Sequence, residues 1–63
     1  MYGLSGMPVK IEFTVTEYDP GQPWVVVATV RDSVELANVA EFPSWARARW
    51  PEPRYAVRVV SGM

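Results

Sequence analysis

The fold is decided by residues 9–16, VKIEFTVT, in which apolar and polar side chains alternate without a break. Strict alternation, with β-branched and aromatic residues on the apolar side, is the pattern of a β-strand that buries one face. The alternation begins at Val9, so residues 1–8 are expected to form a flexible leader. The rest of the fold is predicted outward from this strand.

A second strand is expected directly after the first. Residues 18–23, YDPGQP, place Pro20 and Gly21 where a type II turn prefers proline and glycine. Residues 24–31, WVVVATVR, are rich in the β-branched residues that favour strands. The two strands are therefore expected to pair as a β-hairpin with a loop of about four or five residues.

The segment that follows carries helical signals. Asp32 occupies an N-cap position, and Glu35, three residues later, completes a capping box. Pro43 disfavours helical geometry at Phe42, so the helix is expected to stop or kink there. A second short helical segment, residues 44–50, is expected behind Pro43, which suits the first helical position. The apolar residues that recur at helical spacing are Leu36, Val39, Ala40 and Phe42.

Residues 55–59, YAVRV, alternate again and are expected to form a third strand, followed by a tail at residues 61–63. The predicted fold class is α+β, a single domain of residues 9–60 with element order β-β-α-β and one kinked helix on one face of the sheet. Strand order 2-1-3, antiparallel throughout, is favoured because the first strand has the cleanest division into two faces. Order 1-2-3, with one parallel pair, is the alternative.

The same pattern divides the side chains between the two faces of the sheet. The face toward the helix is expected to hold Val9, Ile11, Phe13, Val15, Val26, Ala28, Val30, Tyr55, Val57 and Val59, covered by Leu36, Val39, Ala40 and Trp50. The second strand is also apolar on its opposite face, which nothing else in so short a chain could cover. Either this reflects strand propensity alone, or the strand pairs with a second copy or a partner. The residues predicted for self-association are Trp24, Val25 and Val27.

The composition excludes most catalytic and metal-binding chemistry. The 63 residues include no Cys and no His, which removes disulfides, thiolate and imidazole metal ligands, and the Ser-His and Cys-His nucleophile pairs. The 7 acidic residues are scattered, and no glycine-rich phosphate loop follows a strand. We therefore expect no enzyme activity, no metal site and no cofactor. Oligomerisation is the remaining support for so small a core.

The charge and hydropathy patterns also limit the partners. The net charge of −1 provides no overall field for nucleic acid or an anionic membrane. The longest apolar run, residues 24–28, is too short to span a bilayer, so no membrane association is expected. The N-terminus lacks the pattern of a secretory signal, and the absence of Cys fits the cytoplasmic location that we expect.

Arginine and aromatic residues interleave over residues 45–58, namely Trp45, Arg47, Arg49, Trp50, Arg54, Tyr55 and Arg58. This mixture is typical of protein-interface hot spots, and it can also clamp phosphates and stack bases. In a purely structural alternative, Trp50 and Tyr55 belong to the core and the arginines are solvated or paired with glutamates. Those glutamates are Glu35, Glu41 and Glu52. The residues predicted to bind a partner are Trp45, Arg47, Arg49 and Arg54.

These features predict a small non-enzymatic protein-binding module that acts stoichiometrically on a protein partner. Compact modules of this kind include accessory regulators and the inhibitors encoded by phages and mobile elements, anti-CRISPR proteins among them, and a function of that class is expected. The alternative is a nucleic-acid-binding regulator that uses residues 45–58, whose binding would weaken steeply with salt.

Overall fold

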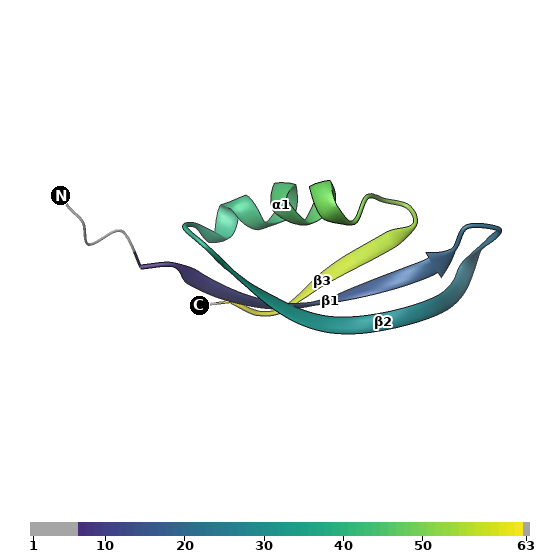
Figure 1. Ribbon diagram of the computed structural model, residues 1–63, viewed down its shortest axis with the longest axis horizontal. Coiled ribbons are helices and arrows are strands. Elements are labelled where there is room, and N and C mark those ends of the chain that lie inside the picture. The colour runs from purple at the N-terminus through teal and green to yellow at the C-terminus, as the bar shows by residue number, and fades with distance from the viewer. Residues whose placement is uncertain (1–6, 63) are drawn as a thin grey trace.

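The computed structural model describes residues 7–62, which form a β-β-α-β domain (Figure 1). Its elements are β1 (Val9–Asp19), β2 (Gln22–Leu36), a 3-10 helix η2 (Val39–Glu41), α1 (Phe42–Arg49) and β3 (Tyr55–Gly62). The sheet has the order β2-β1-β3, and both neighbouring pairs are antiparallel. The predicted fold class and the preferred strand order are therefore confirmed. Of the expected leader, residues 1–8, the first six lie outside the described residues, and residues 7 and 8 precede β1.

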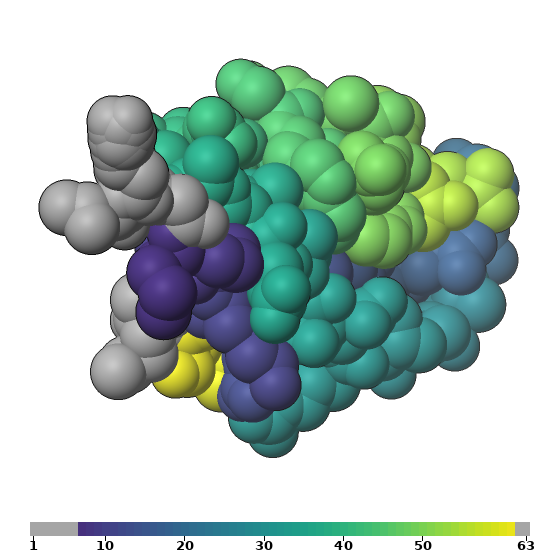
Figure 2. Space-filling view, turned by 60° about the vertical axis from the view of Figure 1, so that its left-hand side comes forward, coloured from purple at the N-terminus to yellow at the C-terminus, as the bar shows by residue number. Residues whose placement is uncertain are grey.

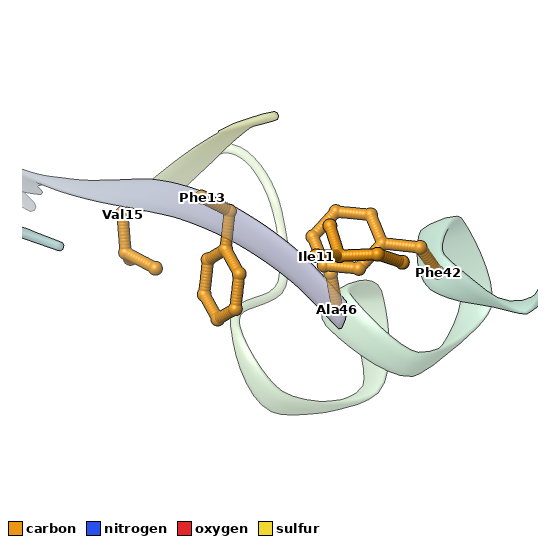
Figure 3. Packing of buried hydrophobic residues seen from close by; sticks show 5 residues of the cluster. All are labelled: Ile11, Phe13, Val15, Phe42 and Ala46. Atoms are coloured by element: carbon orange, nitrogen blue, oxygen red, sulfur yellow. The ribbon is translucent and has the colours of Figure 1, made fainter. Parts of the chain in front are cut away.

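β1 is the central strand because its two faces are so cleanly divided. Ile11, Phe13 and Val15 are buried, whereas Lys10 on the other face is exposed. The buried side chains point from β1 toward the side of the sheet that α1 covers (Figure 3). β1 is hydrogen-bonded to β2 on one side and to β3 on the other, so β2 and β3 are the two edge strands.

The helix begins later than the capping signal at Asp32 predicts. β2 continues through this segment to Leu36, and Asp32 faces Phe13 across the β1/β2 ladder. The strand continues because Val34 and Leu36 recur at a spacing of two, which places them on the buried face opposite Ile11 and Val9. The capping box of Asp32 and Glu35 is therefore a wrong prediction.

Asn38 is the residue that caps the helical segment. Its backbone is extended, and its side-chain Oδ1 accepts a hydrogen bond of 2.8 Å from the backbone N–H of Ala40. Asn is as good an N-cap as Asp. The predicted break at Phe42 is the point where η2 passes into α1, with Pro43 in the first turn of α1.

The end of the helix agrees with the expected segment 44–50. α1 ends at Arg49, and the backbone N–H of Trp50 donates to the carbonyl of Ala46 at 2.8 Å. The connection to β3 contains a cis peptide bond at Glu52–Pro53. β3 runs on through Ser61 and Gly62, so this strand is longer than residues 55–59.

The hairpin turn is tighter than predicted. Asp19 faces Gln22, which leaves a loop of Pro20 and Gly21 only. Gly21 does not adopt the left-handed φ that a type II turn requires at this position. The carboxylate of Asp19 closes the turn instead, because its Oδ1 accepts from the backbone N–H groups of Gly21 at 2.7 Å and Gln22 at 3.2 Å.

The core is smaller than the sequence pattern suggested. Its buried residues are Ile11, Phe13, Val15, Phe42 and Ala46 (Figure 3), with Val9, Val34, Leu36, Trp45, Trp50, Tyr55 and Val57 packed around them. Six side chains expected in the core or over it are exposed instead: Val26, Ala28, Val30, Val39, Ala40 and Val59. Only the part of the sheet beneath the helical segment is covered.

The uncovered part follows from the unequal lengths of helix and strand. The 8 residues of α1 span about 12 Å, whereas the 15 residues of β2 reach about 50 Å. The molecule measures 51 × 17 × 11 Å with a radius of gyration of 14.1 Å, against about 11 Å for a compact chain of this length. Figure 2 shows the green helical segment above β2, whose teal surface lies at the outside of the molecule.

Candidate protein-binding surfaces

The hairpin carries a protruding arm, residues 18–27, which extends past the start of β3 (Figure 1). The β1/β2 register is irregular here, because Glu17 faces Ala28, Tyr18 faces Val26 and Asp19 faces Gln22. Val27 and residues 23–25 are therefore extra residues on β2 that have no opposite residue on β1. Extra residues of this kind turn side chains away from the regular ladder.

The β2 side of the arm, residues 22–27, is mostly apolar and exposed to solvent. Trp24 is 76% exposed, Val26 is 53% exposed and Val27 is 56% exposed. Val25 and, just beyond the arm, Val30 are exposed too. The three residues predicted for self-association, Trp24, Val25 and Val27, thus lie together on this surface. Val26 and Val30 were missed because their spacing assigned them to the core.

The charges at the base of the arm are paired, because Arg54 Nη2 lies 2.9 Å from Glu17 Oε2. Farther along the sheet, Arg31 Nη2 lies 3.1 Å from Glu12 Oε1. The hydrogen bond that Arg54 donates to the carboxylate of Glu17, with the nearby Tyr55 as a second contribution, raises the pKa of Arg54 above its ordinary value. Neither arginine pairs with the glutamates suggested by the structural alternative. The arm therefore presents apolar surface above neutralised charges.

A groove about 240 Å³ in volume runs between α1 and β3. Its lining residues are Phe42, Pro43, Ala46, Arg47, Trp50, Glu52, Tyr55, Val57 and Val59. These residues span most of α1 on one side and the first half of β3 on the other. The groove therefore runs along β3. β3 is an edge strand, so the groove lies beside a free edge of the sheet.

The four residues predicted to bind a partner do not lie in one place. Trp45 is half-buried and packs edge-on against Phe13, with 5.6 Å between ring centroids and 76° between planes. Arg49 lies over Trp45, with its guanidinium carbon 4.4 Å from the ring centroid. Arg47 lines the groove and Arg54 lies at the base of the arm. Trp45 is thus largely part of the core, which the spacing of the helix alone did not reveal.

The arginines likewise do not form the continuous basic surface that a nucleic-acid site would need. Arg58 faces Thr14 in the β1/β3 ladder and so lies on the sheet face opposite α1, away from Arg47 and Arg49 on the helix. Among residues 7–62, no cluster of acidic side chains is suited to hold a metal ion. No helix in the described part of the chain is long and apolar enough to cross a bilayer.

Comparison with known proteins provides no relative: no family model, no curated protein and no solved structure matches this chain. The surfaces themselves are therefore the basis for a functional proposal.

Proposed function

We propose that this protein is a non-enzymatic protein-binding module that inserts its hairpin arm into an apolar cleft of a partner protein. The observation that carries the proposal is the exposure of Trp24, Val26 and Val27 on a protruding arm of a small domain. Soluble monomers rarely expose contiguous apolar surface without a partner for it. None of these three side chains belongs to the core or packs against it.

A cleft suits the arm better than a flat surface does. The arm exposes apolar side chains on both faces of β2. A flat partner surface could contact only one of these faces, whereas a cleft contacts both. The hairpin is also partly ordered by the Asp19 turn before it binds, which reduces the entropy lost on association. Trp24 is the expected anchor, because tryptophans in a desolvated pocket dominate binding free energies.

The extra residues on β2 favour a side-chain contact over strand pairing at the arm. A regular fourth strand needs a continuous row of outward backbone groups, and the irregular register at Tyr18 and Asp19 interrupts this row. We therefore assign Trp24, Val25 and Val27 to a contact with a different protein. The ion pair of Arg54 with Glu17 at the base of the arm predicts binding that depends little on salt, unlike nucleic-acid binding.

The proposal is tested by photocrosslinking in cells of the source organism. Trp24 is replaced by the photoreactive residue benzoylphenylalanine, and Ala48, exposed on α1, carries the same residue in the control protein. We expect one adduct with a different protein from position 24 and none from position 48. The crosslinked protein is then purified and titrated with wild type, Trp24→Ala and Val27→Glu.

The titration decides whether the adduct reflects binding through the arm. Loss of a hot-spot tryptophan costs about 2 kcal/mol or more, so we expect affinity to fall at least about 30-fold for Trp24→Ala. Val27→Glu should weaken binding similarly, and Ala48→Glu should not. Equal affinity of all variants, or an adduct formed only between copies of this chain, would exclude the proposal.

A further inference from the structure

We propose that β3 pairs with β3 of a second copy, antiparallel about a two-fold axis at Val57, to make a six-stranded sheet. The partner is thus another molecule of this protein, and the contact uses the edge opposite to β2. The inference concerns a different surface from the hairpin arm and does not depend on the function proposed for it.

The backbone of β3 is suited to accept another strand. The N–H of Tyr18 donates to the carbonyl of Arg54 at 2.8 Å, whereas the N–H of Tyr55 turns away from β1 and donates to the carbonyl of Pro51 at 3.3 Å. In an antiparallel sheet successive residues alternate between the two sides of the strand. The outward backbone groups after Tyr55 therefore belong to Val57 and Val59, on the edge that faces solvent.

The length of regular strand fixes the centre of the pairing. Phe13 faces Val59 and Glu12 faces Ser61, so Val60 is an extra residue where the ladder is interrupted. Before Tyr55 the chain leaves the sheet through a proline-containing turn. The regular segment is residues 55–59. A two-fold pairing that uses all of it must be centred on Val57.

The side chains in this register are complementary. On the helix side, Tyr55 of one copy faces Val59 of the other, and aromatic residues pair well with β-branched ones. On the opposite side, Arg58 faces Ala56, so the like charges of the two copies are kept apart. Directly opposite residues of two paired strands lie on the same face of the sheet, so the two-fold axis must pass through a residue. The nearest other registers are therefore centred on Ala56 or on Arg58. The first brings Arg54 opposite Arg58, and the second brings Arg58 opposite itself.

The second copy also explains the groove beside β3. α1 packs over β1, so the two helices of the pair are separated by about three strand spacings, or ~14 Å. Packed helices approach to about 8–10 Å, so the helices do not collide. The apolar side chains of Tyr55, Val57 and Val59 from both copies line one shared channel between them. The arm on each β2 stays at the outer edge of the joined sheet.

Single cysteines test the register in a chain that contains none of its own. In Val57→Cys the two sulfurs belong to directly opposite residues, whose Cα atoms are about 5.5 Å apart, within the range that a disulfide bridges. In Ala56→Cys the residues are offset along the strands and lie beyond that range. Under mild oxidation we expect a disulfide-linked dimer of Val57→Cys and a monomer of Ala56→Cys. The reverse result would overturn the proposed register.

Charge variants of Ala56 test the contact without touching the core, because Ala56 is exposed on the face opposite α1. Ala56→Glu places a carboxylate opposite Arg58 of the other copy, and Ala56→Arg places a like charge there. By sedimentation equilibrium we expect the dimer dissociation constant to fall about 2- to 30-fold with Glu and to rise by a similar factor with Arg. Circular dichroism confirms that both variants fold.

Three results would overturn the inference. The wild-type protein could remain monomeric at every concentration, or the two Ala56 variants could dimerise alike. Alternatively, the dimer could be abolished by Val27→Glu and be indifferent to Ala56, which would place the contact on the arm. Because the Ala56 variants leave the buried residues unchanged, they decide the matter even if Val57→Cys is poorly folded.

Discussion

The indole of Trp45 packs edge-on against the ring of Phe13, with 5.6 Å between the ring centroids. The same phenylalanine lies 5.2 Å from Phe42 and 5.5 Å from Trp50. Both ends of α1 therefore contact the sheet through one side chain of the central strand. In a domain with five buried residues among those described, Phe13 is the position on which packing of the helix depends most.

Replacing Phe13 with Ala should remove a large part of the stability of the protein. Large-to-small changes at buried aromatic residues cost about 3–5 kcal/mol, and a chain of this length has a total stability of about 3–9 kcal/mol. Urea denaturation followed by circular dichroism measures the loss. Thr14→Ala, the adjacent residue on the other face, should cost less than about 1 kcal/mol. Equal losses at the two positions would contradict the packing described.

Arg49 and Trp45 should be coupled weakly. The guanidinium lies over the indole at 4.4 Å, and an exposed cation–π contact contributes about 0.5–1 kcal/mol. A double-mutant cycle with Arg49→Ala and Trp45→Leu should therefore give a coupling free energy in that range. Arg47, on the same helix but in the groove lining, is the matched control and should show no coupling to Trp45. A coupling of zero for Arg49 would mean that its stacking does not persist in solution.

Asn38 and Asp32 should respond differently to the same substitution. Asn38→Ala removes the hydrogen bond to Ala40 and should lower the free energy of unfolding by about 1 kcal/mol. Asp32→Ala should change it by less than about 0.5 kcal/mol, because Asp32 is exposed in β2 and caps no helix. Thermal or urea denaturation of both variants decides between the two positions. A larger loss at Asp32 would restore the helix start that the sequence signal indicates.

This pair also shows where sequence reasoning succeeded and failed. β1 was predictable because its alternation is unbroken, and that alternation also favoured its central place between β2 and β3. The start of the helix was not predictable, because two local signals compete. One is the capping box of Asp32 and Glu35, and the other is Asn38 as a single N-cap residue. The choice between them depends on whether Val34 and Leu36 gain more by packing against β1 than by entering a helix. That is a tertiary effect, which no local pattern contains.

The candidate surfaces were predictable in part. Val25 and Val27 were expected on the sheet face opposite the helix, and apolar residues there pointed to a contact on β2. The exposure of Val26 and Val30 was not predictable from the pattern, because it depends on how little of β2 the helix covers in the structure. The opposite error occurred at Trp45, which was expected to bind a partner. Its ring reaches Phe13 because α1 begins at Phe42, two residues before the expected segment 44–50, so that Phe42 and Trp45 lie three residues apart on one face of the helix.

Gly21 should tolerate a side chain, although a glycine behind a proline in a turn often does not. Its φ lies outside the left-handed region, and an added Cβ would come no closer than 3.4 Å to Asp19 Oδ1, an ordinary contact. Gly21→Ala should therefore leave the stability unchanged or raise it by about 0.4–1 kcal/mol, because alanine has less freedom in the unfolded chain. Asp19→Ala is the matched variant and should lower stability by about 1 kcal/mol, because the backbone N–H groups of Gly21 and Gln22 lose their acceptor. Urea denaturation of the two proteins measures both effects, and a loss of 1 kcal/mol or more in Gly21→Ala would show that the turn is type II after all.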